Sequence, residues 1–475
     1  MKLEGDEQVK TIAAEVRTDG ATTDPTRMPP GPLPTPRNFV RYYTDRTRVM
    51  TEMAAKYGPT YTMWVPNFGK TVIVTAPEST NALFRMSPDV VEAKEPTLDV
   101  MFGSGSIFGK KGEEHRRHRR VLTPPFHGRS LRSFEELVEH ETVREMATWP
   151  IGREFETHPP TMRITLNIIL RAVFGAEGAE FDELRSFMPH WIRFGATLFA
   201  IPPLRWDFGP GSLWRRHVAY RRRFDAILER VIATVRADPD FESRPDVLSL
   251  LLRSRDEDGE ELSHERIGDE LVTLLAAGHE TTATSLSWAF ERLSRNPRVL
   301  DRLVEEVDTD GGSTYLQAVI HEVMRTRPAV DGTIRTVYAE RMRLGEWVLP
   351  RGTTIHIATS VAHNDPAHFV RPAEFDPDRF LGRMPDTVAW TPYGGGLHRC
   401  IGATFANMEM SVILRTVLRS FRVLPTDAPD EPIAFRGLPY APGKGGRIRI
   451  TPRRRPTVSV TEVAGGAGPA SCPFH

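Results

Sequence analysis

One cysteine in a glycine-rich loop constrains this chain more than any other feature. The loop runs from Tyr393 to Gly402 and reads YGGGLHRCIG, so Cys400 follows two basic residues and precedes an apolar segment. Glycines lack a Cβ atom and accept positive φ, which lets a porphyrin approach the backbone closely. Loop N–H groups and the N-terminus of a following helix would stabilise a thiolate. Cys400 is therefore a candidate single axial ligand for haem iron.

The alternative is a helix-capping glycine loop with an incidental buried cysteine, because short motifs carry false positives. The chain has no disulfide framework, since its second cysteine, Cys472, stands within the last four of 475 residues. It also lacks a Cys-x-x-Cys pair for structural zinc. Three further segments decide between the two interpretations.

The composition is that of a soluble globular protein and excludes several classes of function. The 62 basic and 62 acidic residues leave no net charge, so a broadly basic surface for nucleic acid is not indicated. No stretch reaches the 18 apolar residues of a transmembrane helix, and Met1 to Gly20 has no signal-peptide core. We expect a cytoplasmic, soluble protein, with peripheral membrane contact left open.

The pattern along the chain predicts three parts. We expect a flexible leader over residues 1–27, a single globular domain over 28–451, and a disordered tail rich in Pro, Gly and Ala over 452–475. Helical patterns dominate the domain, with a hairpin between Thr60 and Thr75 and a second strand-rich patch from Arg335 to Val361. Because strands and helices do not alternate regularly, the fold class is mainly α with small β-sheets.

One long helix is predicted from an N-cap at Ser263 to Asn296-Pro297. About 33 residues at 1.5 Å each span roughly 50 Å, so this helix must cross the whole domain. Midway, the polar residues of AAGHETT interrupt its apolar face, among them Glu280 and Thr281. One interpretation is a local groove for dioxygen and water in which these two side chains handle protons; the other is a satisfied polar kink.

Two more segments have residue spacings that indicate specific contacts. Glu322 and Arg325 share one helix face among apolar neighbours, and Arg379 follows downstream, so a buried ion pair could fix the layer beneath the cysteine loop. In the basic run around residues 112–120, His115 and Arg119 can point together at one anion, such as a haem propionate. The alternatives are an exposed ion pair and a solvated face.

In this order, the basic helix, the central-helix motif, the Glu-x-x-Arg pair and the cysteine loop resemble the cytochrome P-450 superfamily over roughly residues 28–451. The sequence looks most like actinobacterial, mycobacterial-type members. The resemblance implies the cytochrome P-450 fold, with a long central helix over haem b (iron protoporphyrin IX) and the cysteine-ligand loop beneath it.

The resemblance also implies a role for each matching residue. Cys400 would be the proximal thiolate, and Glu280 with Thr281 would deliver protons to iron-bound oxygen. The haem contacts it implies are those of His115, Arg119, Ala277, Arg335, Tyr393, Gly396, His398 and Gly402. Two positions depart from the usual pattern: Tyr393 stands where Phe is common and could alter the polarity around the thiolate, and His398 stands where Arg is common.

The implied activity is insertion of one oxygen atom from O₂ into an apolar small molecule, such as a lipid, sterol, terpenoid or polyketide-like compound. No room remains after residue 451 for a fused flavin reductase, so electrons are expected from a separate ferredoxin and its reductase. The alternatives are a peroxide-driven peroxygenase, a rearrangement catalyst, and a non-enzymatic haem sensor or carrier. The intact Glu280–Thr281 pair favours the monooxygenase.

The same resemblance indicates where substrate would bind. The pocket is expected to be lined by Thr97–Phe108, Leu274–Ala277, Ala329–Thr333 and Leu438–Tyr440. Within it, Asp331 could orient a polar substrate group or, as we expect, cap a turn with Gly332. The aromatic segment from Phe187 to Trp214 is expected to include an access lid.

Two patterns imitate other sites. Residues 103–109, GSGSIFG, imitate a dinucleotide-binding loop, but their spacing is off by one, and neither a preceding strand nor a following helix is predicted. His356, His363 and His368 near Asp365 could suggest a metal site, but they lack helical spacing. We interpret the histidines as satisfied polar residues.

Overall fold

The computed structural model describes residues 20–453 apart from 94–97, 176–177, 256–258, 310–311, 383–387 and 437–438. The rest of the expected leader, and the tail with Cys472, lie outside the described residues. The helices are α2 (Pro36–Thr44), α3 (Arg46–Tyr57), α4 (Pro77–Arg85), α5 (Asp99–Phe102), α6 (Gly112–Leu122), α7 (Arg129–Met146), α8 (His158–Phe174), α9 (Ala179–Ala200), α10 (Leu213–Arg236), α11 (Val247–Arg253), α12 (His264–Arg295), α13 (Pro297–Asp308), α14 (Thr314–Thr326), α15 (Thr359–Ala362) and α16 (Ala403–Ser420). The strands are β1 (Thr60–Val65), β2 (Gly69–Val74), β3 (Val91–Ala93), β4 (Glu154–Glu156), β5 (Thr333–Val337), β6 (Arg341–Leu344), β7 (Trp347–Pro350), β8 (Thr354–Ile357), β9 (Phe421–Val423), β10 (Ile433–Phe435), β11 (Tyr440–Pro442) and β12 (Arg447–Pro452).

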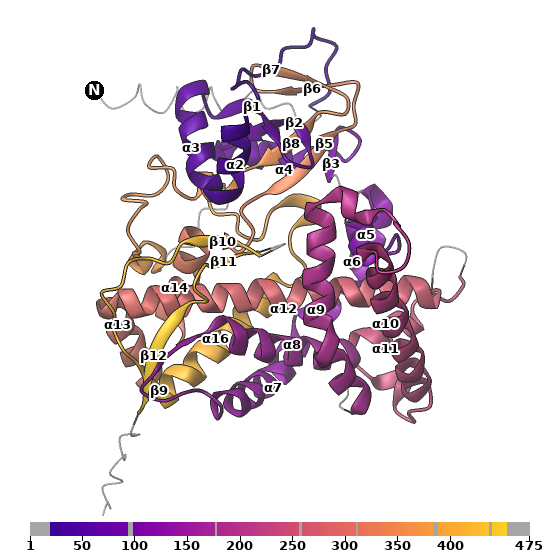
Figure 1. The fold of residues 1–475 in the computed structure, drawn as a ribbon, viewed down its shortest axis with the longest axis vertical. Coiled ribbons are helices and arrows are strands. Elements are labelled where there is room, and N and C mark those ends of the chain that lie inside the picture. Colours follow the sequence, from indigo (N-terminus) through magenta and orange to yellow (C-terminus); the bar gives the residue numbers. More distant parts are fainter. Residues whose placement is uncertain are drawn as a thin grey trace, which may run out of the picture.

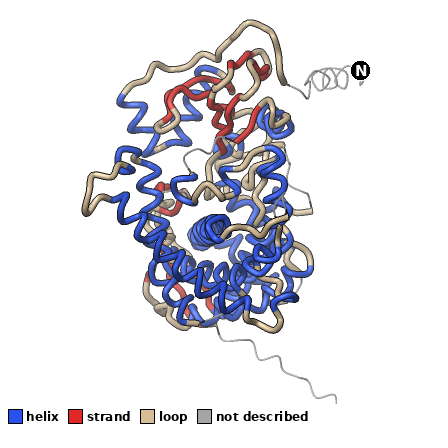
Figure 2. The backbone as a smooth tube through the Cα atoms, turned by 90° about the vertical axis from the view of Figure 1, so that its right-hand side faces the viewer, coloured by secondary structure: helices blue, strands red, loops and turns tan. Residues whose placement is uncertain are grey.

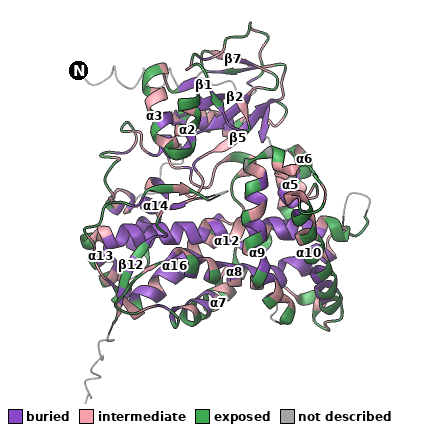
Figure 3. Cartoon of the chain, viewed as in Figure 1, coloured by how far each residue is buried: buried purple, intermediate pink, exposed green. Residues whose placement is uncertain are grey.

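Helix α12 crosses the whole molecule (Figure 1), and the view turned by 90° looks along its axis (Figure 2). The Ser263 side chain accepts a hydrogen bond from the N–H of Arg266, which confirms the predicted N-cap. The helix is buried along most of its length (Figure 3) and packs on α8 and α16. The expected mainly α fold with a long central helix is therefore confirmed.

A five-stranded sheet in the order β1-β2-β8-β5-β3 forms the upper part of the molecule (Figure 1). Strands β1 and β2 pair antiparallel, as the predicted hairpin required, and β8 from the second strand-rich patch pairs parallel to β2. Strand β5 lies between β8 and β3, so that Arg335 is opposite Ala93. This pairing brings Arg335, a predicted haem-contact residue, beside β3, which the sequence analysis did not single out.

Residues 20–27, the end of the expected leader, are ordered against the separate two-stranded β6–β7 sheet. Ala21 forms a bridge with Met342, and Arg27 forms one with Val348. The Arg27 N–H donates to the Val348 carbonyl at 3.0 Å, and the Val348 N–H donates back at 2.9 Å. Residues 20–27 therefore lie along the β6–β7 hairpin and pair with both of its strands, because each strand of a two-stranded sheet leaves backbone groups on its outer edge that a neighbouring segment can pair.

The loop that imitates a dinucleotide-binding site is bound to α12 instead. The Gly105 N–H donates to the Asp269 carboxylate at 2.7 Å, and the Ile107 N–H donates to Glu270 at 3.1 Å. Gly103 has φ +88°, and a Cβ there would lie 2.1 Å from the Asp269 carboxylate. These glycines therefore serve a close approach to α12, and the arginine of α10 that also binds Asp269, Arg221, links the loop to that helix.

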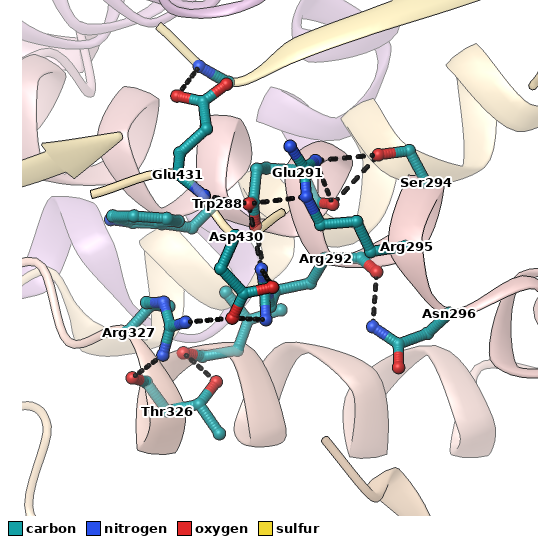
Figure 4. Close-up of polar contacts among 12 residues, drawn as sticks. Trp288, Glu291, Arg292, Ser294, Arg295, Asn296, Thr326, Arg327, Asp430 and Glu431 are labelled. Atoms are coloured by element: carbon teal, nitrogen blue, oxygen red, sulfur yellow. Dashed lines mark hydrogen bonds and ion pairs between the residues drawn. The ribbon is translucent and has the colours of Figure 1, made fainter. Parts of the chain in front are cut away.

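A polar network at the other end of α12 holds the loop that precedes β10 (Figure 4). The buried Glu291 carboxylate pairs with Arg292 at 2.5 Å and accepts the Glu431 N–H at 3.0 Å. Asp430 bridges Arg292 and Arg327 at 2.6 and 3.0 Å. Because residues 430–431 lead directly into β10, this network fixes the β10–β11 hairpin above α12.

The Glu-x-x-Arg pair is fully buried, as the sequence analysis expected. Both side chains have zero exposure, with Arg325 Nε 2.7 Å from the Glu322 carboxylate. Arg379 approaches the same carboxylate at 3.2 Å, and Arg325 also donates to the carbonyls of His363, Pro372 and Glu374. The carboxylate thus organises the loop that precedes the cysteine segment.

Replacing Glu322 should destabilise the protein strongly. Glu322→Gln leaves two arginines without their shared carboxylate, and breaking a buried pair in this way costs about 3–5 kcal/mol. We expect a clear fall in the free energy of unfolding measured by urea denaturation with circular dichroism. The matched control is Glu113→Gln, which breaks exposed pairs with Arg116 and Arg120 and should leave the midpoint of urea unfolding unchanged. Equal effects of the two substitutions would contradict this assignment.

Candidate functional site

Cys400 keeps accessible surface although protein atoms surround it closely. Cys400 is exposed, and its N–H donates to the Tyr393 carbonyl at 2.9 Å, which closes the loop. Burial by the surrounding atoms raises the pKa of the thiol, whereas the Gly402 N–H, Arg119 and Arg399 lower it. Once a metal ion binds the sulfur, the same three groups would stabilise the thiolate.

The glycines of this loop are required by α4. A Cβ at Gly395 would lie 2.3 Å from the Phe84 ring, and one at Gly396 would lie 2.1 Å from the Phe84 carbonyl oxygen. Gly394 and Gly396 both adopt positive φ, at +65° and +64°. Any larger side chain would push the loop away from Phe84, so these glycines fix the position of Cys400.

The hydroxyl of Tyr393 is bound away from the sulfur. It donates to Asn407 Oδ1 on α16 at 3.0 Å, and burial raises the pKa of this phenol well above its usual range. The side chain remains a neutral phenol whose proton is engaged. The hydroxyl is therefore directed toward α16, and its effect on the polarity around the thiolate stays a prediction.

The expected propionate contacts converge around a carboxylate that the sequence analysis missed. The imidazole rings of His115 and His398 lie 4.1 Å apart, and His398 Nε2 donates to Glu92 on β3. Glu92 also accepts the N–H groups of Ala93 and Gly112 at 2.9 and 3.2 Å. Burial disfavours the Glu92 charge, but His398 and these N–H groups outweigh it and lower the pKa to about 2.

His115 supplies an unpaired group to this cluster. Its Nδ1 is buried and has no hydrogen-bond partner among the described residues. Burial, with the neighbouring His398, lowers the pKa of His115 to about 3, so its ring is neutral at physiological pH. A neutral ring can still donate one N–H to an anion.

Two arginines complete this side of the site. Arg119, on α6 with His115, donates to the Arg399 carbonyl at 2.5 Å. Arg335 is buried on β5 with its guanidinium 5.7 Å from the Phe84 ring centroid. The structure therefore brings His115, His398 and Arg335 toward one region, while Arg119 contacts the cysteine loop itself.

The central polar motif does not break α12, which continues as regular helix through residues 276–282. The Thr281 hydroxyl donates back to the Ala277 carbonyl at 2.9 Å, and Thr282 donates similarly to Gly278 at 3.4 Å. A Cβ at Gly278 would lie 2.9 Å from the Ile169 side chain, so this glycine allows α8 to pack closely.

Glu280 is the unusual member of this motif. Its side chain is 8% exposed, and its Oε2 has no hydrogen-bond partner among the described residues. Burial raises its pKa to about 7, with Arg193 of α9 opposing the shift. A carboxyl group with that pKa can both hold and release a proton near neutral pH.

A second buried acid, Glu409, lies across from α12 on α16. Neither of its carboxyl oxygens has a well-aligned partner among the described side chains, although the Thr282 hydroxyl is close enough to lower the pKa. Burial outweighs that contact and holds the pKa of Glu409 well above its usual range. An acid on the apolar face of the helix after Cys400 was the signal that could have identified it.

The histidines considered as metal ligands are separate. His363 Nε2 accepts the Thr391 N–H at 2.9 Å, whereas His356 contacts Arg46 and His368 lies near Glu78 and Asp365. Within the described ranges, no three His, Cys, Asp or Glu side chains form a metal cluster. His363 and His356 are thus hydrogen-bonded within the protein, whereas His368 Nδ1 is buried without a hydrogen-bond partner among the described residues.

The residues present fit a haem. An accessible thiol lies in a glycine loop whose neighbours stabilise its anion. An unpaired histidine nitrogen and two arginines border the region where the acidic edge of the porphyrin would lie.

Among the helices that the structure describes, none has the length and apolar character needed to span a bilayer.

Comparison with known proteins agrees with this geometry. The family model for cytochrome P-450 matches residues 28–444. The chain is 47% identical over 444 residues to a protein described as cytochrome P-450 138 of Mycobacterium tuberculosis, covering 93% of this chain and all of that one. It is also 35% identical over 460 residues to cytochrome P-450 135B1 of the same species, covering 94% and 95% of the two chains.

Solved structures show the same fold. The retinoic acid-bound cyanobacterial CYP120A1 superposes with a TM-score of 0.78 at 23% identity, covering 90% of this chain and all of that one. CYP102L1 superposes with a TM-score of 0.77 at 22% identity, covering 91% and 100%. With the whole-domain family match and the mycobacterial relatives, this chain belongs to the cytochrome P-450 family, whose members bind haem and are haem-thiolate monooxygenases.

Proposed function

We propose that this protein hydroxylates a small apolar molecule, with Cys400 as the iron ligand and electrons from a separate ferredoxin and its reductase. Bound haem supplies the binding and activation of O₂. The observation that carries the proposal is Glu280, a buried acid without a hydrogen-bond partner for Oε2 and with a pKa of about 7, in the middle of α12. A sensor or carrier has no need of such a group.

Glu280 and Thr281 have complementary proton roles. The carboxyl of Glu280 holds a proton that it can release near neutral pH, with Arg193 stabilising the resulting carboxylate. The Thr281 hydroxyl donates to Ala277, so its oxygen lone pairs remain available to accept a hydrogen bond from a neighbouring donor. Together they would pass protons one at a time while the apolar helix excludes bulk water.

The remaining haem contacts follow from the clusters described above. His115, Arg119 and Arg335 would hold the propionates, with His398 held by Glu92 through Nε2 so that only its Nδ1 is left to face them. Gly396 and Gly402 would lie against the porphyrin on the cysteine side, and Ala277 on the α12 side. Tyr393 would shield the sulfur with its ring.

An apolar substrate is supported by the segments expected to line the pocket. Among their described residues, Met101, Phe102, Ile107, Leu275 and Ala276 are all buried and apolar. Thr97 and Leu438 lie outside the described residues. Substrate would therefore be recognised mainly by burial of apolar surface, with only a few polar contacts.

Thiolate ligation by Cys400 can be tested by absorbance. The reduced holoprotein with carbon monoxide should show a strongly red-shifted Soret band, because thiolate donates electron density to the iron. Cys400→Ala should lose this band. A Soret band at the shorter wavelength of neutral-thiol or histidine ligation, or folded protein without haem, would overturn the assignment.

Glu280 should impose a pH dependence on turnover. Below pH 7 its carboxyl is protonated and can donate, whereas above pH 7 it is ionised, so kcat should fall as the pH rises through about 7. Glu280→Gln should lower kcat by about 100-fold and abolish this limb, since the amide cannot release a proton at neutral pH. The measurement is product formation at saturating substrate and redox partner across neutral pH.

Glu265→Gln is the matched control, because this acid is exposed in the first turn of the same helix. It should leave both kcat and its pH profile unchanged. A Glu280→Gln profile that still falls through pH 7 would assign the ionisation to another group.

The exposed Arg399 beside the cysteine loop is proposed to face an acidic redox partner. Arg399→Glu should slow the first electron transfer from ferredoxin about tenfold at low ionic strength, with the difference shrinking in high salt. Stopped-flow reduction measures this rate. Arg215→Glu, on α10, should leave it unchanged, and a normal rate for Arg399→Glu would argue against this docking face.

A further inference from the structure

Glu92 is a buried carboxylate beside the propionate side of the site, which is formed by His115, Arg119, Arg335 and His398. It belongs to β3, the edge strand of the five-stranded sheet, and its side chain is only 3% exposed. Burying a carboxylate is costly unless hydrogen bonds and charges compensate it. The groups that compensate Glu92 therefore show which parts of the molecule this residue connects.

The first contact joins Glu92 to the beginning of α6. Its Oε2 accepts the N–H of Gly112, the first residue of this helix, at 3.2 Å. Lys111 at the N-cap makes no side-chain capping bond, so a carboxylate from another part of the chain takes that place. The negative charge also lies at the positive end of the helix dipole. Glu92 thereby fixes the start of the helix that carries His115 and Arg119.

The second contact joins Glu92 to the cysteine loop. His398 Nε2 binds Glu92 Oε1, which also accepts the Ala93 N–H at 2.9 Å. The ring of His398 in turn packs against the ring of His115, with their centroids 4.1 Å apart. His398 is therefore held from β3 and from α6 at the same time, and these two neighbours fix the orientation of its ring.

The third connection runs through the sheet to Arg335. Strands β3 and β5 pair antiparallel, with Glu92 opposite Thr336 and Ala93 opposite Arg335. This backbone pairing fixes the position of Glu92 relative to the strand that carries Arg335. All four residues of the propionate side therefore stand on elements that meet at Glu92.

The charge of Glu92 is unsuited to holding the propionates directly. Although burial disfavours the charge, His398 and the two backbone N–H groups lower the pKa of Glu92 to about 2, so it is an anion at neutral pH. An anion at this place repels other anions. Any contribution of Glu92 to haem binding must then come from the placement of the groups that it holds.

We propose that Glu92 is the positioning residue of the propionate side: it holds His398 and the beginning of α6 together, so that the groups on both reach the propionates at once. The contacts that it makes are formed within the protein itself. Haem then meets a set of groups that is already in place, which lowers the cost of ordering them on binding. This inference rests on the haem contacts of the proposed function and adds the residue that prepares them.

The test measures how fast ferric haem leaves the folded holoprotein, by its transfer to excess apomyoglobin. Glu92→Gln keeps the length of the side chain but removes its charge and one of its two acceptor oxygens. Glu92→Asp keeps the charge but is one methylene shorter. Both should speed haem loss about tenfold, because losing a partner that orients a binding group weakens binding by about that factor or more. Relief of charge repulsion alone predicts slower loss from Glu92→Gln.

Reconstitution with haem dimethyl ester separates positioning from a general loosening of the protein. The ester lacks the charged propionates, so the Glu92 substitutions should leave its rate of loss unchanged, whereas a loosened protein would release both haems faster. The matched control is Asp89→Asn, which removes the same charge from an exposed side chain three positions earlier. It should leave both rates unchanged.

His398→Ala keeps the test decisive if the Glu92 variants fail to fold. It removes a partly exposed ring and leaves Glu92 with its two backbone donors, so β3 and α6 should stay joined. We expect haem loss from this variant to be about tenfold faster, with loss of the dimethyl ester unchanged.

Four outcomes would overturn the inference: slower or unchanged haem loss from either Glu92 variant, equal acceleration for haem and its ester, faster loss from Asp89→Asn, or unchanged haem loss from His398→Ala. Failure of the proposed function is distinguished separately, since these rates need no turnover. A holoprotein that behaves as expected here but forms no hydroxylated product would defeat that function and leave the role of Glu92 in place. A hydroxylating enzyme whose haem loss is indifferent to Glu92 would defeat this inference alone.

Discussion

The structure depends on how the long helix α12 compensates the acids that it buries. At its start, Asp269 and Glu270 accept backbone N–H groups of the loop at residues 103–107 and thereby attach it. At its end, Glu291 pairs with Arg292 and holds the loop that precedes β10. Glu280 lacks such a partner for Oε2, and its pKa rises to about 7. The helix thus uses its acids to attach loops at both ends and retains a titratable one in the middle.

Patterns within one segment were predictable from sequence, because their causes are local. The N-cap at Ser263 and the i,i+3 pair of Glu322 with Arg325 followed from spacing alone. Glu92 could not be found in this way, since its partner His398 lies 306 positions along the chain and the two side chains meet only in the folded structure. The ion pair that joins Arg46 of α3 to Asp331 in the loop before β5 also could not be found from local spacing.

Glycine patterns were visible in the sequence, but their reasons were not. In the cysteine loop, Gly395 and Gly396 are required by Phe84 of α4, more than 300 positions earlier. In the loop that imitates a dinucleotide site, Gly103 is required by the carboxylate of Asp269. In both places a glycine permits close approach, but the approaching group is protein, so the pattern alone cannot identify a ligand.

The pKa values show which side chains carry charge on the side of the site that would face the propionates. With pKa values of about 3 and 2, His115 stays neutral and Glu92 stays ionised at any pH above about 4. The lasting positive charges are therefore those of Arg119 and Arg335, since guanidinium groups do not lose their protons in proteins. His115 can add a hydrogen bond but no charge.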